Sequence, residues 1–258
     1  GCRVSVAVLV AVPRGSAVDI DVGSGRVEVR ETRGPVEVDS GSGGVAVKRA
    51  AGRVSVDSGS GSVEVEEVQG EVRVDLGSGA VNLSRISGTV EVDGSVTVCD
   101  VAGEVNVDTS SGSVRLRRVL GDISVDTGSG SVRLESVRGR QVHVDTGSGS
   151  IEAEFDILRD GSYSFDTGSG DVILTLPEDA SFTLDANTGS GPIRCSLPLA
   201  GAYSDHGPFH GVLGDGSAVI EVDTSSGGLV VRGRRGMGRG DEPGRHTTSR
   251  MAQRPSGR

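Results

Sequence analysis

The chain has 258 residues, of which 42 are glycine, and its aromatic residues are four Phe, two Tyr and no Trp. This length suits one or two globular domains or one repeat array, and so much glycine argues against an ordinary core rich in Leu and aromatics. The net charge is −10, of which residues 232–258 contribute +6 and residues 1–231 contribute −16. An acidic body argues against nucleic acid as a partner, because phosphate binding needs a basic face.

The first segment, residues 4–12, is apolar and alternates in part with small residues, as a strand does. It is too short to cross a bilayer, so the visible chain contains no transmembrane segment. The chain begins at Gly1, and we expect any targeting segment to lie upstream. Cys2, Cys99 and Cys195 form no Cys-x-x-Cys pair, so no zinc or dithiol site is predicted. Lipidation of Cys2 is a minor alternative.

Most of the chain repeats with a period of about 18 residues, which is the signature of a repeat architecture. In one copy, the strand Val54-Ser55-Val56-Asp57 leads into the corner Gly59-Ser60-Gly61, and a second strand covers residues 63–65. Alternation of Val with polar residues predicts that the Val side chains point inward. Val68 breaks the alternation and marks a bend, and Gly70 closes the copy. The repeating aspartate falls at Asp21, Asp39, Asp57, Asp75, Asp93, Asp108, Asp126, Asp145, Asp166, Asp185 and Asp223.

A single copy cannot bury its own Val face, but stacked copies hydrogen-bond each strand to its equivalents above and below, about 4.8 Å away. We therefore predict an all-β, single-stranded parallel β-solenoid (β-helix) of about 18 residues per coil, with about ten or eleven coils over roughly 50 Å. Right-handed coiling is expected from the chirality of β-crossovers. The rival is a meander of antiparallel hairpins closed by Gly-Ser-Gly, although the constant register favours the solenoid.

The irregular copies lie at defined places. The copy at Asp93-Gly94-Ser95-Val96 is shorter, which predicts a tighter turn, and the copy after Asp145 is longer. All six aromatics lie between Phe155 and Phe209, which predicts a wider, better-filled C-terminal end that caps the rod. We divide the chain into a solenoid over residues 1–232, whose N-terminal part we expect to be truncated, and a disordered Gly/Arg-rich tail over residues 233–258.

The aspartate column is the most specific polar feature. One hypothesis is a ladder of calcium sites at Asp57, Asp75, Asp126 and Asp145, by analogy with β-rolls of 18 residues per coil. In those rolls, however, the aspartate follows the glycines, whereas here it precedes them. The favoured interpretation is an Asx-type corner, in which the carboxylate accepts a backbone N–H one or two residues later.

Other chemistry finds little support in the sequence. The Gly-Ser-Gly corners recur too often to be active sites, and no Gly-Lys-Ser/Thr motif or dinucleotide fingerprint is present. His206 and His210 share an irregular loop with Asp205 and Asp215, which leaves a metal site there as a minor alternative, while His143 is predicted to be a surface strand residue. The corners are too short for the long catalytic loops of polysaccharide-cleaving β-helices. No cofactor and no catalytic residue is predicted.

Three motifs carry a family resemblance. They are residues 12–16 leading into residues 21–25, the repeated Val-x-Val-Asp-Thr-Gly-Ser-Gly, and residues 174–177 leading into residues 187–191. Over residues 4–232, the chain resembles a bacterial family of adhesin-like β-strand-repeat domains of unknown function, and it is similar to toastrack and auto-transporter-adhesin head domains. The resemblance implies an extracytoplasmic, non-catalytic domain of the cell envelope or surface.

We therefore expect a structural and interaction module rather than an enzyme. A rigid rod would present outward residues such as Glu64, Arg73, Arg115 and Arg133 to an unknown protein or to an envelope or surface ligand. The alternative is a calcium-binding, β-roll-like module. A polysaccharide-active β-helix enzyme is a more distant alternative.

Overall fold

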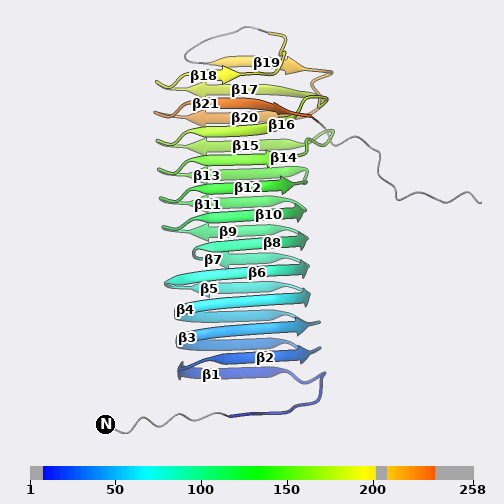
Figure 1. The fold of residues 1–258 in the computed structure, drawn as a ribbon, viewed down its shortest axis with the longest axis vertical. Coiled ribbons are helices and arrows are strands. Elements are labelled where there is room, and N and C mark those ends of the chain that lie inside the picture. The colour runs from blue at the N-terminus through cyan, green and yellow to red at the C-terminus, as the bar shows by residue number, and fades with distance from the viewer. Residues whose placement is uncertain (1–7, 202–207, 236–258) are drawn as a thin grey trace, which may run out of the picture.

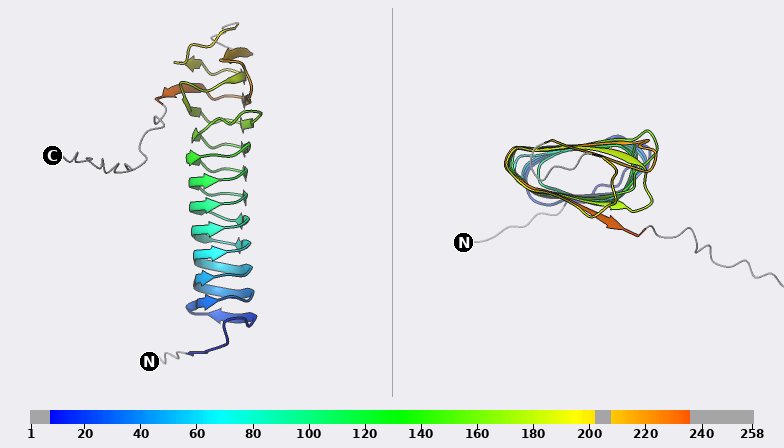
Figure 2. Two further views of the ribbon diagram at one scale, coloured as in Figure 1. Left: turned by 90° about the vertical axis from the view of Figure 1, so that its right-hand side faces the viewer. Right: turned by 90° about the horizontal axis from the view of Figure 1, so that it is seen from above.

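The computed structural model describes residues 8–201 and 208–235, and every regular element in this part of the chain is a β-strand. The strands are stacked into an upright rod (Figure 1), and the view along the rod shows a flattened outline (Figure 2). Each coil contributes one strand to each of two walls. The fold is the all-β, mostly parallel solenoid of about 18 residues per turn that the repeat predicts.

The first wall holds the Val-x-Val-Asp strands, and the second wall holds the strands that follow each Gly-Ser-Gly corner. The first wall consists of β1 (Val18–Ser24), the first parts of β3 (Val36–Ala50) and β4 (Val54–Gln69), β5 (Val72–Leu76), β7 (Val90–Asp93), β9 (Val105–Thr109), β11 (Ile123–Thr127), β13 (Gln141–Thr146), β15 (Ser162–Thr167), β20 (Val219–Thr224) and β17 (Phe182–Thr188). The second wall consists of β2 (Val27–Thr32), the second parts of β3 and β4, β6 (Gly79–Ser87), β8 (Val96–Ala102), β10 (Val114–Leu120), β12 (Val132–Val137), β14 (Ile151–Phe155), β16 (Val172–Pro177), β21 (Leu229–Arg234) and β18 (Ile193–Cys195).

Neighbouring coils pair in parallel and in register. Val54 lies beside Val36 on one side and beside Val72 on the other. Val54 and Val72 are both 0% exposed, so the stacked Val residues form the core between the two walls. Because β-branched side chains pack well on a pleated surface, a core made mostly of Val is sufficient here. The rival meander of antiparallel hairpins is wrong.

The Gly-Ser-Gly corners stack backbone against backbone. Gly61 has a φ of +139°, and a Cβ atom placed on it would lie 1.8 Å from the carbonyl oxygen of Gly43 in the preceding coil. No residue with a side chain fits such an approach, and the left-handed φ adds to the strain. The recurrence of these glycines therefore has a structural cause.

The threonine after the aspartate closes the corner in the later coils. Thr167 Oγ1 donates to the carbonyl of Gly149 in the preceding coil across 3.0 Å and accepts the N–H of Gly170 across 3.0 Å. Thr146 and Thr224 make the same pair of hydrogen bonds. In these described corners, the threonine hydroxyl accepts the corner N–H, and the preceding carboxylate does not. The Asx-type interpretation of the aspartates is corrected accordingly.

The C-terminal coils do not stack in chain order. About nine turns follow one another from β1 to β16, and the next coil in sequence, β17 and β18, is displaced outward. The last coil is inserted beneath it: β20 lies between β15 and β17, and β21 lies between β16 and β18 (Figure 1). The order of the coils in space therefore differs from their order in the sequence at this end.

The predicted cap is present in a different form. β19 (Phe209–Leu213) pairs antiparallel with the outer edge of β17, so the first wall ends in a strand of opposite direction. Phe155, Tyr163 and Phe165 fill the wider coils, and their rings lie 4.8–5.5 Å apart. β21 extends to Arg234, and residues 236–258 of the predicted tail lie outside the described residues.

Candidate interaction surface

In each of the first seven coils, one residue of the second wall has a left-handed backbone. From the first coil upward these residues, which we call the bend column, have φ values of 51° to 59°. This conformation turns the strand over, so that two outward residues are followed by another inward one, such as Val68, Ile86 or Val119. It is the bend that the break in alternation predicts. The bend column consists of Glu31, Arg49, Glu67, Arg85, Asp100, Arg118 and Ser136.

A left-handed backbone is unfavourable for residues with a side chain, at about 1 kcal/mol or more each. Glycine would remove that cost, yet the first six positions of the bend column are all charged. Packing of the inward Val and Ile residues offsets the strain, but it does not require a charge. The charges therefore have a separate explanation in what the side chains contact.

The charges of the bend column alternate in sign from coil to coil. Arg49 pairs with Glu31 across 3.1 Å, and Arg85 Nε lies 3.3 Å from Glu67 Oε1. Arg118 donates two hydrogen bonds to Asp100, one of them 2.7 Å long. These hydrogen bonds from the guanidinium hold the pKa of Asp100 below its usual value. Alternation avoids like-charge contacts between in-register coils, which are destabilising.

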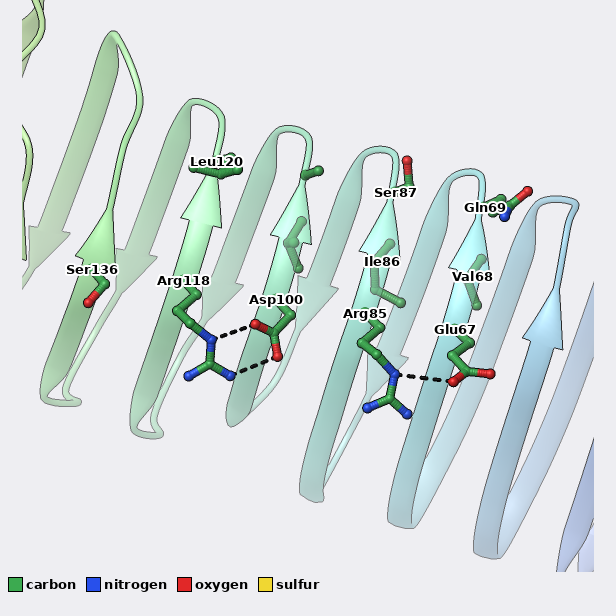
Figure 3. Close-up of a pocket in the computed structure, with 12 residues that line it drawn as sticks. Glu67, Val68, Gln69, Arg85, Ile86, Ser87, Asp100, Arg118, Leu120 and Ser136 are labelled. Atoms are coloured by element: carbon green, nitrogen blue, oxygen red, sulfur yellow. Dashed lines mark hydrogen bonds and ion pairs between the residues drawn. The ribbon is translucent and has the colours of Figure 1, made fainter. Parts of the chain in front are cut away.

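A shallow groove of about 640 Å³ runs beside the bend column (Figure 3). Its other side is formed by the residues two positions further along each strand, among them Gln69, Ser87, Ala102 and Leu120. Ser87 and Ala102 are small, and Leu120 is an exposed apolar side chain, with 59% of its surface accessible. The groove thus has a row of charged side chains along one side. Its other side has small residues in the middle and one exposed apolar side chain, Leu120.

The outward faces of both walls carry further ion pairs between coils. Arg73 Nη1 lies 2.9 Å from Glu91 Oε2, Lys48 Nζ lies 3.0 Å from Glu64 Oε1, and Arg133 Nη1 lies 2.8 Å from Glu152 Oε2. Arg115 is outward as well, in register with Arg133. The residues predicted for display are therefore on the surface, and most of them already have a partner in the neighbouring coil.

The aspartate column is continuous along the first wall. Asp57 lies in register with Asp75, and Asp126 with Asp145. Burial and the carboxylates of Asp75 and Asp108 raise the pKa of Asp93, and burial with Asp145 and Asp223 raises the pKa of Asp166. At the C-terminal end the column continues through Asn187 rather than Asp185. Asp185 pairs instead with Glu221 and His210 of the neighbouring strands.

The structure does not group these acids as metal ligands. Within the described ranges, no cluster of three or more His, Cys, Asp or Glu side chains is arranged to hold a metal ion. His210 Nδ1 lies 2.6 Å from Asp185 Oδ1, whereas Asp215 accepts a hydrogen bond from the N–H of Ser217. His206 and Asp205 lie outside the described residues, and His143 is on the outer face of β13. The calcium alternative stays a prediction.

The N-terminal end of the rod is a second distinctive surface. β1 and β2 each pair with β3, and their other edges have no partner among the described strands. Val8, Leu9, Val10 and Val12 are 49–98% exposed beside this end. In the described part of the chain, we find no helix with the length and apolar character needed to cross a membrane.

These features define a β-solenoid repeat module whose charged surface groups recur from coil to coil. The family model of Toastrack DUF4097 matches residues 4–119 and 90–232, so the chain belongs to this family of domains of unknown function. The match agrees with the resemblance to toastrack domains and does not extend to an adhesin role. No curated protein and no solved structure matches the chain.

Proposed function

We propose that this chain is a non-catalytic structural and interaction module, adhesin-like and located at the envelope or surface of a bacterial cell. The observation that carries the proposal is the regular rod. About nine sequential turns present the same outward positions at a constant spacing on two walls. A partner would be a protein or an envelope or surface component that contacts several coils at once, because single coils offer only small polar patches.

The arrangement of charges supports display rather than catalysis. The carboxylates beside the groove, such as Asp100, are paired with Arg side chains of the next coil and have no reactive neighbour that would make them an acid or base. The Toastrack family is a domain of unknown function rather than a known enzyme family. A polysaccharide-active enzyme remains the distant alternative. Release of reducing ends from pectin-like or mucin-like polymers by the purified chain would favour it.

The location is tested by export. The full-length gene product is fused to alkaline phosphatase, which is active only outside the cytoplasm, and expressed in a bacterial host. We expect phosphatase activity and cleavage of the fusion by protease added to cells with a permeabilised outer layer. An inactive fusion that resists the protease until the cells are lysed would contradict the envelope location.

The interaction role is tested with isolated cell envelopes. The purified chain is mixed with envelope fragments and sedimented, and the bound fraction is compared with that of Arg73→Glu/Arg133→Glu, which reverses one charge on each wall. We expect the chain to co-sediment and the charge-reversed variant to bind less. Equal and negligible sedimentation of both proteins would count against display.

The aspartate column supports the alternative of a calcium-binding module. Its carboxylates stack in register, and bound cations would relieve their repulsion. Thermal unfolding is followed by circular dichroism with about 1 mM calcium and with excess chelator, the range of weak extracellular sites. Equal melting points would leave the aspartates as surface residues of a self-sufficient rod. Folding that requires calcium would replace the display proposal with the calcium module.

A further inference from the structure

Four consecutive positions of the bend column carry charges in strict alternation. In coil order they are Glu67, Arg85, Asp100 and Arg118, and Figure 3 shows them in one line beside the groove. The side chains are 41–52% exposed, so pairing within the chain leaves about half of each one accessible. The charges are separated by the coil repeat, about 4.8 Å.

A surface complementary to this row needs charges at the same spacing, with the opposite sign at each facing position. A second rod meets both conditions when it lies alongside in the opposite direction, because reversing an alternating row of four charges produces its complement. Glu67 then faces Arg118 of the second copy, and Arg85 faces Asp100 of the second copy. Two rods lying in the same direction and in step would place like charges together, which is unfavourable.

The groove follows the same symmetry. A two-fold axis that crosses the rod between Arg85 and Asp100 also passes between Ser87 and Ala102, the small residues of the groove. The axis then brings Leu120 of each copy to the part of the groove beside Gln69 of the other. Covering the exposed Leu120 there removes apolar surface from water, which is favourable at about 25 cal/mol per Å².

We propose that two copies of this chain associate side by side and antiparallel, through the bend column and its groove, with the two-fold axis between Arg85 and Asp100. The partner is a second copy, so the inference goes beyond the proposed display function. The contact is narrow, as expected for interfaces at the weak end of the usual range. We therefore expect a reversible dimer whose association weakens as salt is added.

Sedimentation velocity over a range of concentrations measures the dissociation constant. Arg85→Glu/Arg118→Glu makes all four positions acidic and is expected to raise that constant at least about tenfold, because four ion pairs become like-charge contacts. The matched control reverses all four charges: Glu67→Arg, Arg85→Glu, Asp100→Arg and Arg118→Glu. This inverted row still alternates, so the variant is expected to fold and dimerise like the original chain.

A mixture of the original and inverted chains determines the direction. Antiparallel pairing predicts homodimers without mixed dimers. In an antiparallel mixed dimer, each charge of the original chain would face a charge of the same sign on the inverted chain. Parallel pairing predicts the opposite, with mixed dimers favoured over homodimers. Native mass spectrometry of the mixture, with one chain isotopically labelled, distinguishes the two results, and predominance of mixed dimers would overturn the proposal.

The open N-terminal end is the competing contact, and Leu9→Asp tests it. We expect this variant to dimerise as before, because Leu9 lies far from the groove. A dimer that Leu9→Asp abolishes and that Arg85→Glu/Arg118→Glu leaves intact would overturn the proposal, as would an original chain that stays monomeric up to about 1 mM. Either result would leave envelope binding, measured by co-sedimentation, as a separate question.

Discussion

Asn187 Nδ2 donates a hydrogen bond to Asp223 Oδ1 across 3.0 Å, although 36 positions separate the two residues in the sequence. The two side chains are in register on β17 and β20, at the place where the aspartate column would otherwise continue. An amide next to a carboxylate replaces like-charge repulsion with a hydrogen bond. Asp223 therefore has a hydrogen-bonding neighbour in the column, whereas the interior aspartates lie between other aspartates.

We expect Asp93→Asn to stabilise the rod at neutral pH. Asp93 lies between Asp75 and Asp108, and removal of one charge from three in a row relieves two repulsive contacts. Asp93 is exposed, so screening by solvent limits the gain to about 0.5 kcal/mol. Urea unfolding measures it. Glu91→Gln is the control on the same strand and should be slightly destabilising, because Glu91 pairs with Arg73.

The same gain should depend on pH. The pKa of Asp93 is raised above its ordinary value of 3.8 in the folded state, so the folded chain binds more protons than the unfolded one as pH passes through that window. The stability of the original chain therefore falls as pH rises from 3.8 through the raised pKa. The advantage of Asp93→Asn should appear above this window and disappear below it. An advantage of equal size at all pH values would show that repulsion is not its source.

We expect Thr167→Val to cost about 1–2 kcal/mol in the free energy of unfolding. Its hydroxyl group makes two hydrogen bonds that close a corner and join two coils. Thr127 occupies the equivalent position two coils lower on the same wall, is 1% exposed, and its Oγ1 has no hydrogen-bond partner. Thr127→Val should therefore be neutral or stabilising. Equal losses for both variants would show that the hydrogen bonds do not carry the effect.

Two adjacent glycines allow a direct test of corner stacking. A Cβ atom on Gly43 would lie 1.8 Å from the carbonyl oxygen of Gly25, and the φ of Gly43 is +140°. The nearest atom to a Cβ on Gly44 is 3.6 Å away. We expect Gly43→Ala to destabilise the chain by more than about 2 kcal/mol, whereas Gly44→Ala should stay within about 0.5 kcal/mol. Similar unfolding midpoints in urea would contradict the stacking of these corners.

The regular coils could be predicted because their information is local. Each copy carries its own inward Val pair, corner glycines and bend, and in-register stacking follows once these agree over many copies. The alternation of Glu67, Arg85, Asp100 and Arg118 was also present in the sequence at the coil period. The apolar pattern does not reveal it, because the bend residues point outward and their charges are related only across coils.

The order of the last coils could not be predicted in this way. β17 and β20 both carry alternating apolar residues followed by a threonine, so either strand satisfies the edge of β15 by its pattern alone. Which strand takes this edge depends on whether β15 pairs more favourably with β17 or with β20, and both pairings join strands that are distant in the sequence. The register of β17 with β20 places Asn187, and not the predicted Asp185, in the aspartate column.

The inserted coil should hold the C-terminal end together. Ile220 on β20 is 0% exposed and lies between Tyr163 of β15 and Leu184 of β17, so it contacts both neighbouring coils of the core. Ile220→Ala should cost about 2–5 kcal/mol, because it leaves a cavity that two coils must share. Val219→Ala is the adjacent control, with Val219 40% exposed, and should cost far less.

Hydrogen exchange gives the more specific readout of these two variants. If β20 separates β15 from β17, Ile220→Ala should speed amide exchange in β17 and β20 while the coils from β1 to β12 keep their protection, since each coil contacts only its neighbours. Faster exchange confined to β20, with β17 still protected, would mean that β17 is held by β19 or by β15 directly. That result would contradict the inserted order of the last coil.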